Sequence, residues 1–258
     1  MADTLRLEID DRGVATITLT RAEKHNAMNA ALIDALAGAA AEIASQPVRA
    51  AVLAAEGRSF SAGGDLAWMR AQMEADRATR MAEARRLAAM LGALDRLPVP
   101  LIARVQGQAF GGGLGLMAVS DVVIAAEGVR LGFTETRLGL IPATIGPYVT
   151  ARMGPRIREV FASARGFRAE EAVRLGLVSR VVPAEALDDA IAEEVAACLT
   201  VAPGAAGRAK ALLRTLGLTV TEAAVEASIT ALADQWETAE AADGIAAFFE
   251  RRPAPWAP

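Results

Sequence analysis

Two glycine-rich stretches are the part of this sequence whose residue types and spacing could do chemistry. "SAGGD" (61–65) and "FGGGLG" (110–115) each follow a short apolar run and precede a helical pattern. A helix N-terminus presents unpaired N–H groups and the positive end of the helix dipole. If the two turns converge, their amides form a two-donor pocket for a developing oxyanion, which glycine lets approach the backbone. Close packing of strand on helix without a ligand is the alternative, and the glycines alone leave it open.

Glu135 is the acid whose surroundings suit proton transfer. It lies in the largely apolar stretch "LGFTETRLGLIPATIGPY" (131–148). Burial would raise its pKa toward neutrality, where a carboxyl group works as a general acid or base. The alternative is a carboxylate paired with Arg137 or Arg130, which is the commoner arrangement for such a residue.

Several other kinds of chemistry are disfavoured by the residue counts. Cys198 and His25 are the only cysteine and histidine, so we expect no disulfide, no metal site and no Ser-His-Asp triad. His25 lies in the polar stretch "RAEKHNAMN", which favours a surface position over catalysis. A dinucleotide fingerprint started at Gly111 would need glycine where Leu116 stands, and neither glycine cluster is followed by a Walker lysine. Acid–base chemistry is therefore expected from carboxylates.

The composition predicts a globular protein that is cytoplasmic. The chain has 258 residues, 53% hydrophobic and 22% charged, with a net charge of −4. This balance argues against nucleic acid as a partner. Asp121 interrupts the longest apolar stretch, so we expect no membrane partner, and the charged first residues do not resemble a signal peptide.

The hydrophobic periodicity predicts an α/β protein, in which strands and helices alternate and a helical C-terminal module follows. The expected elements are a hairpin over 5–20, a helix over 28–43 capped by Asn26 or Asn29, strands over 49–57, 101–107, 122–128 and 129–135, one long helix from Asp65 to about Leu97, a helix over 114–121, and a helix pair over 220–252.

Taken together, these stretches resemble the crotonase, or enoyl-CoA hydratase/isomerase, family. The resemblance covers nearly the whole chain in order and is carried by "RAEKHNAMN" (21–29), "FSAGGDL" (60–66), "QGQAFGGGLGLMAVSDVVIAAE" (106–127), "FTETRLGLIPA" (133–143), "EAVRLGLVSRVVP" (171–183) and "GIAAFFERR" (244–252). It implies a ClpP-like spiral of ββα units, with a core over 1–195 that holds the CoA-thioester site. A helical module over 196–258 would serve oligomerisation, as a homotrimer or a dimer of trimers, and would complete the active site.

The resemblance also implies roles for individual residues. Gly64 and Gly112 match the oxyanion-hole amides that hold the thioester as it becomes an enolate, and Glu135 matches a catalytic glutamate. Coenzyme A belongs to the substrate, and no separate cofactor is implied. Residues implied to contact the CoA thioester are Ala22, Lys24, Ala62, Gly64, Asp65, Leu66, Gly112, Phe248 and Arg251.

Gly115 departs from the family pattern, because it stands where hydratases carry their first catalytic glutamate. Hydration of a short or branched enoyl-CoA is the preferred interpretation, with a similarity to the bacterial 3-methylglutaconyl-CoA hydratase branch in "FSAGGDLAWM" and "IPATIGPYV". Glycine at 115 is also expected to enlarge the pocket. The alternatives are an isomerase that uses Glu135 as its single proton shuttle, and a non-catalytic acyl-CoA-binding homologue.

Overall fold

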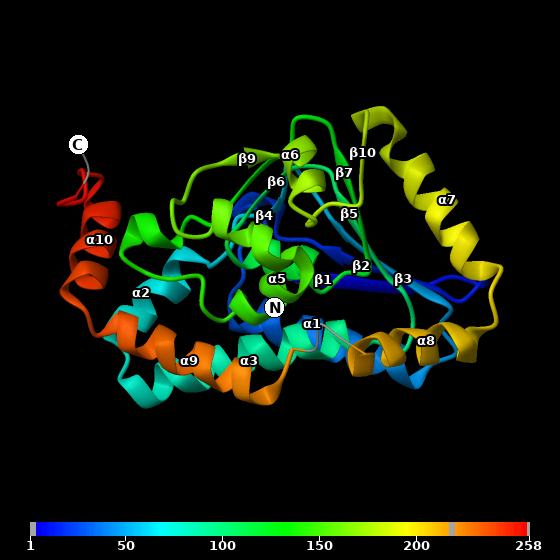
Figure 1. The fold of residues 1–258 in the computed structure, drawn as a ribbon, viewed down its shortest axis with the longest axis horizontal. Coiled ribbons are helices and arrows are strands. Elements are labelled where there is room, and N and C mark those ends of the chain that lie inside the picture. The colour runs from blue at the N-terminus through cyan, green and yellow to red at the C-terminus, as the bar shows by residue number, and fades with distance from the viewer. Residues whose placement is uncertain (1–3, 217–219, 257–258) are drawn as a thin grey trace.

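The computed structural model describes residues 4–216 and 220–256, which form two sheets surrounded by helices (Figure 1). Within these residues the larger sheet has the order β1-β2-β3-β5-β7-β10 and the smaller sheet the order β4-β6-β8-β9. The strands are β1 (Leu5–Ile9), β2 (Val14–Leu19), β3 (Ala50–Ala55), β4 (Ser59–Ser61), β5 (Leu101–Val105), β6 (Gln108–Phe110), β7 (Val122–Ala126), β8 (Arg130–Gly132), β9 (Phe167–Arg168) and β10 (Arg180–Val182). The α-helices are α1 (Ala30–Ser45), α2 (Leu66–Glu74), α3 (Arg77–Asp95), α4 (Gly112–Ala118), α5 (Gly146–Met153), α6 (Ala169–Arg174), α7 (Leu187–Leu199), α8 (Pro203–Leu216), α9 (Glu222–Trp236) and α10 (Ala239–Glu250).

The predicted α/β spiral is confirmed by how successive strand pairs are divided between the two sheets. β3, β5 and β7 pair in parallel in the larger sheet, and the strand after each one, β4, β6 or β8, lies in the smaller sheet. A helix follows each pair. Parallel strands buried on both faces carry continuous apolar runs, as in "AAVLAA" of β3. The second strand of each pair therefore delivers the chain to the same edge of the smaller sheet.

The first two strands form the predicted hairpin. Its register joins Leu5 to Leu19 and Ile9 to Ala15. The Asp10 side chain accepts the N–H groups of Arg12 and Val14, each at 2.9 Å. This turn is typical of an aspartate that bonds the backbone two residues on.

The helix that follows is capped by Asn29 and not by Asn26. The side chain of Asn29 accepts the N–H of Leu32 at 2.9 Å. Asn26 is buried with a positive φ of 52°, and its amide donates to the carbonyl oxygens of Glu56 and Ser59. Asn26 therefore joins the chain before α1 to the loop before β4.

The prediction of one long helix from Asp65 to Leu97 is wrong, because two helices occupy this stretch. Asp65 caps α2, which ends at Glu74, and Ala75 adopts an extended backbone with ψ of 155°. Asp76 then accepts the N–H of Thr79 at 2.7 Å and starts α3. The Asp76 cap thus starts a second helix within a stretch whose apolar pattern continues without a break.

The C-terminal helices cover the core from several sides (Figure 1). α7 packs on the larger sheet, α9 on α3, and α10 on the 3-10 helix η2 (Glu135–Leu138). The predicted helix pair over 220–252 is confirmed by α9 and α10. The division of the chain at residue 195 stays a prediction, and α7 runs across it.

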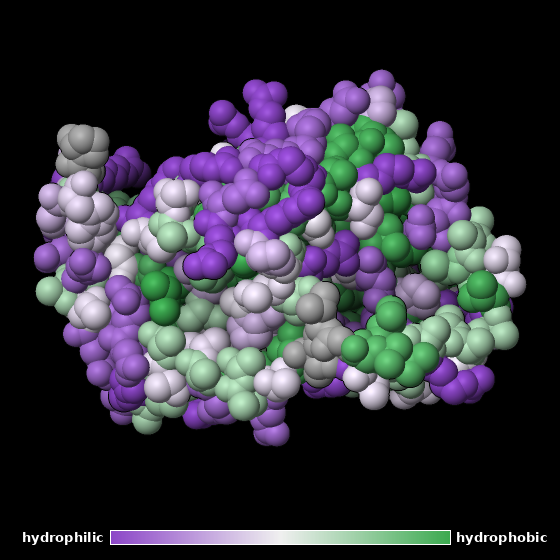
Figure 2. All heavy atoms as spheres, viewed as in Figure 1, coloured by the Kyte–Doolittle hydropathy of each residue, from purple (hydrophilic) through white to green (hydrophobic). Residues whose placement is uncertain are grey.

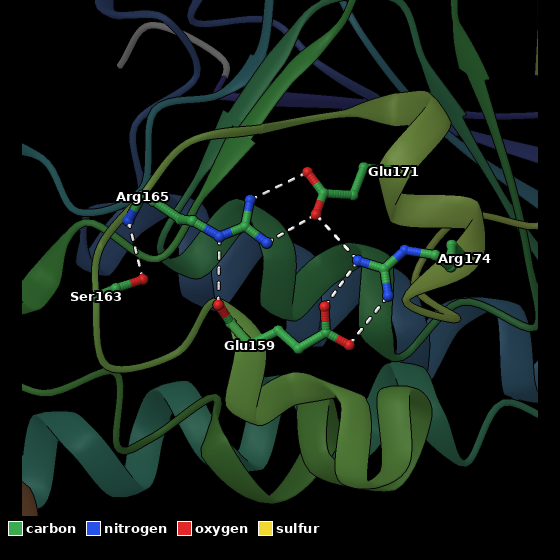
Figure 3. A network of polar contacts seen from close by, with 5 residues as sticks. All are labelled: Glu159, Ser163, Arg165, Glu171 and Arg174. Atoms are coloured by element: carbon green, nitrogen blue, oxygen red, sulfur yellow. Dashed lines mark hydrogen bonds and ion pairs between the residues drawn. The ribbon is translucent and has the colours of Figure 1, made fainter.

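An exposed network of ion pairs connects α6 with the preceding 3-10 helix η3 (Gly154–Glu159) (Figure 3). Glu171 accepts both terminal nitrogens of Arg165, and Arg174 bonds both oxygens of Glu159 and one of Glu171. Two arginines alternate with two glutamates, so each charge orders the next. This network holds the start of α6 beside η3.

Among the described residues, no single helix is long and apolar enough to span a membrane. One helix pair, Ala184–Leu199 followed by Pro203–Leu216, has the length and composition of a membrane span when the two helices are counted together, but the two are bent by 101° relative to each other.

Candidate active site

Both glycine turns and Glu135 lie on one cavity of about 550 Å³. The turns arrive from β4 and β6, which are neighbours in the smaller sheet, and Glu135 follows β8, the next strand along. The prediction that the two turns converge is therefore confirmed. The sheet order brings together residues that are distant in the sequence, such as Gly64 and Glu135, which are 71 positions apart.

The first turn is held in place by the chain before α1. Met28 donates its N–H to the carbonyl of Gly63 at 2.7 Å, and its own carbonyl accepts the N–H of Asp65 at 2.8 Å. These two hydrogen bonds form an isolated parallel β-bridge between Met28 and the intervening residue, Gly64, without using the N–H of Gly64. No acceptor among the described residues takes the Gly64 amide hydrogen. The turn thus leaves one N–H at the cavity wall without a partner in the described part of the chain.

The second turn needs glycine for its backbone conformation and for close approach. Gly111 has φ of +48° and donates its N–H to Gly132 at 3.1 Å. A Cβ at Gly113 would lie 2.8 Å from the carbonyl oxygen of Ser61, and from the side of the first turn a Cβ at Gly63 would lie 2.9 Å from the carbonyl oxygen of Phe110. Gly112 is the first residue of α4, and no acceptor in the described chain takes its amide hydrogen. Two N–H groups without acceptors therefore lie on adjacent turns of the same cavity.

Glu135 is the first residue of η2 and is not paired with an arginine. Neither Arg137 nor Arg130 forms an ion pair or hydrogen bond with it, so the structure contradicts the paired alternative. Its Oε2 is buried and has no hydrogen-bond partner among the described residues. Its Oε1 lies 2.8 Å from the position that a Cβ of Gly111 would occupy. The carboxylate is thus packed against the second glycine turn.

Burial sets the protonation behaviour of Glu135. Loss of solvation raises its pKa from 4.5 to about 7, while the backbone amides of Glu135 and Thr134 act in the opposite direction. A carboxyl group with this pKa both accepts and donates a proton near neutral pH.

Gly115 does not line the cavity, and the expectation that it enlarges the pocket is wrong. A Cβ at this position would lie 2.6 Å from Cγ2 of Ile145 and 3.5 Å from Cδ1 of Leu91. Ile145 does line the cavity. The space that a larger residue at 115 would need is therefore filled by Ile145, which belongs to the segment after η2.

The remaining predicted contact residues divide into two groups. Ala62, Leu66 and Phe248 line the cavity with the catalytic candidates. Four others do not line it: Ala22, Lys24, Asp65 and Arg251.

The structure gives each residue of the second group a definite place outside the cavity lining. Asp65 caps α2 through Ala67 at 2.9 Å and forms an ion pair with Arg21 at 2.9 Å, which is a structural role. Ala22 and Lys24 lie on the 3-10 helix η1 (Ala22–Lys24). The next residue, His25, accepts the N–H of Ala62 with its backbone carbonyl. Arg251 is exposed at the C-cap of α10. Contacts of these residues with CoA stay predictions.

His25 lies outside the cavity. Its Nδ1 is 2.9 Å from the hydroxyl of Ser59, and its backbone carbonyl accepts the N–H of Ala62 at 2.9 Å. Among the described residues, no group of three or more histidine, cysteine or acidic side chains is placed to hold a metal ion.

The sequence prediction missed the helical wall of the cavity. Gln72 of α2, Arg80 of α3 and Trp236 of α9 all line it. Each stands on an ordinary amphipathic helix, so no local motif marks it. Only the packing of α3 against α9 brings these side chains to one cavity.

Comparison with known proteins identifies a single family. Residues 10–258 match the model of the enoyl-CoA hydratase/isomerase family. A protein from Mycobacterium bovis named probable enoyl-CoA hydratase is 31% identical over 261 residues, which cover 97% of this chain and 96% of that protein. The crystal structure of an enoyl-CoA hydratase from Shewanella pealeana is 35% identical with a TM-score of 0.80, and covers 98% of this chain and 96% of its own. An enoyl-CoA hydratase from Mycobacterium avium is 27% identical with a TM-score of 0.88, covering 99% and 100%.

Proposed function

This chain belongs to the enoyl-CoA hydratase/isomerase family, and on that premise we propose that it adds water across the 2,3 double bond of a short or branched enoyl-CoA. One observation carries this proposal. The amides of Gly64 and Gly112, which have no acceptor among the described residues, line the same cavity as the buried and unpaired carboxylate of Glu135. Two donors and one acid–base group are the components that an enolate mechanism requires.

In the proposed reaction Glu135 moves both protons. Its carboxylate takes a proton from water as the water oxygen bonds to C3. The electron pair of the double bond moves toward the thioester, whose oxygen becomes an enolate held by the N–H groups of Gly64 and Gly112. The protonated Glu135 then donates to C2, which restores the carboxylate and completes addition on one face. A pKa of about 7 suits both halves of this cycle.

Isomerisation is the second candidate, and one observation favours it. Glu135 is the only acidic residue among those that line the cavity in the described chain. A single carboxylate is sufficient to take a proton from C2 of a 3-enoyl-CoA and return it to C4, with the same two amides holding the enolate.

The choice between the two reactions is made by product analysis in ¹⁸O-labelled water. The protein is incubated with crotonyl-CoA, 3-methylglutaconyl-CoA and 3-hexenoyl-CoA, and the products are analysed by mass spectrometry. Label in a 3-hydroxyacyl product, together with loss of enoyl-thioester absorbance, supports hydration. A conjugated product without label identifies the isomerase. Binding of the esters without turnover contradicts both reactions and identifies an acyl-CoA-binding homologue.

We also propose that the chain assembles as a homotrimer or a dimer of trimers in the cytoplasm, with acyl-CoA as its ligand and no further cofactor. Support for assembly comes from α8, where Leu212, Leu213 and Leu216 are 55%, 70% and 72% exposed. Figure 2 shows hydrophobic surface over this helix. Leu213→Glu combined with Leu216→Glu is expected to reduce the mass measured by light scattering to that of the 26.8 kDa monomer. An unchanged mass would place the interface elsewhere.

A further inference from the structure

Arg80 is a cation that lines the cavity and is held in a fixed position. Its Nε donates to the carbonyl of Gln72 at 2.8 Å, and its Nη2 donates to the carbonyl of Met73 at 3.0 Å. Its guanidinium carbon lies 5.4 Å from the centre of the Trp236 ring. These contacts, one of which is a cation–π contact with Trp236, orient the guanidinium, and no acceptor among the described residues takes its Nη1 hydrogens. A guanidinium held in this way is prepared to bind a carboxylate.

Other arginines of α3 differ from Arg80, because they have acidic partners. Arg77 pairs with Asp234 at 2.5 Å and with Glu237 at 3.0 Å, and Arg85 pairs with Glu226 at 2.9 Å. No acidic side chain in the described parts of the chain forms an ion pair with Arg80. Asp76, one turn before Arg80, uses its carboxylate to cap α3, and the charge of Arg80 is a minor contribution to the lowered pKa of Asp76.

Gln72 supplies a second polar group at the same wall. The residue is only 6% exposed and lines the cavity. Its backbone carbonyl binds Arg80, but its side-chain amide has no hydrogen bond to any described residue. The amide atoms of Gln72 are not among the fully buried side-chain atoms that lack a partner, so they face the open cavity and are available to a ligand. A free amide beside an arginine that has no carboxylate partner in the described chain suits a ligand that carries an anionic oxygen.

The wall formed by Arg80 and Gln72 is separate from the reacting centre. Arg80 is held by Gln72 and Met73 of α2 and by Trp236 of α9, whereas Glu135 is packed against the second glycine turn. Apolar side chains from α2 and α3, among them Met69, Ala84 and Leu87, complete this side of the cavity. Because these residues line one cavity, a substrate with its thioester at the glycine turns can extend its acyl chain along the apolar side chains to Arg80.

We propose that Arg80 and Gln72 bind a carboxylate at the far end of the acyl chain, so that the substrates are enoyl-CoA thioesters of dicarboxylic acids. This inference rests on the proposed function. Arg80 donates to the carboxylate from Nη1, and Gln72 donates from its side-chain amide. Hydrogen bonds to charged groups are strong enough that losing the arginine costs about 10- to 100-fold in kcat/KM.

Two substrates of equal chain length test the proposal. 5-Carboxy-2-pentenoyl-CoA has a terminal carboxylate where 2-hexenoyl-CoA has a methyl group. The unmodified protein is expected to prefer the carboxylated substrate. Arg80→Met keeps an unbranched apolar side chain at this position and removes the guanidinium group with its charge. It is expected to lower kcat/KM for the carboxylated substrate about 10- to 100-fold and to leave the value for 2-hexenoyl-CoA within about threefold. Arg77→Met, which removes an ion pair between the same two helices, is the matched control and is expected to leave the ratio of the two substrates unchanged.

Two kinetic results would overturn the inference: no preference for the carboxylated substrate in the unmodified protein, or an equal loss with both substrates in Arg80→Met. A binding measurement separates this inference from the proposed function. Calorimetry with saturated adipyl-CoA and hexanoyl-CoA requires no chemistry. If neither enoyl substrate reacts but adipyl-CoA binds more tightly than hexanoyl-CoA in an Arg80-dependent manner, the proposed reaction is wrong and the carboxylate site stands. Equal binding of the two esters refutes the site itself.

Discussion

Replacing Glu135 by glutamine is expected to stabilise the fold at high pH while abolishing catalysis. Burial raises the pKa of Glu135 from 4.5 to about 7. An acid whose pKa is higher in the folded state leaves the protein fully stable below pH 4.5, and stability is lost as the pH rises to about 7. At 1.36 kcal/mol for each pKa unit, the cost is about 1 kcal/mol at pH 5 and about 3 kcal/mol at pH 8. Glutamine carries no charge, so Glu135→Gln removes this cost.

The measurement is urea unfolding of both proteins at pH 5 and pH 8, at one protein concentration because assembly contributes to stability. Any constant cost of the buried amide cancels between the two pH values. The stability of the variant relative to wild type should therefore increase by about 2 kcal/mol from pH 5 to pH 8. Glu226→Gln is the control: Arg85 lowers the pKa of Glu226, so the stability that this carboxylate contributes is present at both pH values and is lost only at lower pH, and the variant should be destabilised by nearly the same amount at pH 5 and pH 8. Equal differences for Glu135→Gln at both pH values would refute the argument that Glu135 is buried without a charge partner.

Three further predictions concern the same site. For the unmodified protein, kcat/KM is expected to rise with pH through a midpoint near 7, because Glu135 must be ionised to accept the first proton, and a profile flat from pH 5 to pH 9 would contradict this. Gly112→Pro removes one of the two amide hydrogens proposed to hold the enolate, at the first residue of α4, where a helix tolerates proline. The added ring carbons displace only the methyl end of the Met28 side chain. Steady-state kinetics should therefore show a loss of about 100- to 1,000-fold in kcat. Gly115→Glu is expected to lower the free energy of unfolding by at least about 3 kcal/mol, because Ile145 fills the space beside residue 115 and the new carboxylate has no charge partner there. The double variant Gly115→Glu, Ile145→Ala should recover part of this loss, as measured by urea unfolding.

Much of the candidate site could be predicted because its components are local. Gly111 adopts a positive φ, and the Asp65 cap shapes the backbone within a few residues, so short stretches of sequence carry their signals. Glu135 stood out because an acid within an apolar run is unusual. The break between α2 and α3 was missed although Asp76 is a good cap residue, because the apolar pattern continues across it.

The sequence by itself determined the glycine turns, the Asp65 cap, the alternation of strands and helices, and the family that their order identifies. Only the tertiary structure decided which side chains share the cavity. Ile145 occupies the space beside Gly115, and Arg80 and Gln72 meet at a wall formed by separate helices. The physical reason is that a backbone conformation depends on its immediate neighbours, whereas the unpaired state of Glu135 or Arg80 depends on every element packed around it, and those elements come from distant parts of the chain.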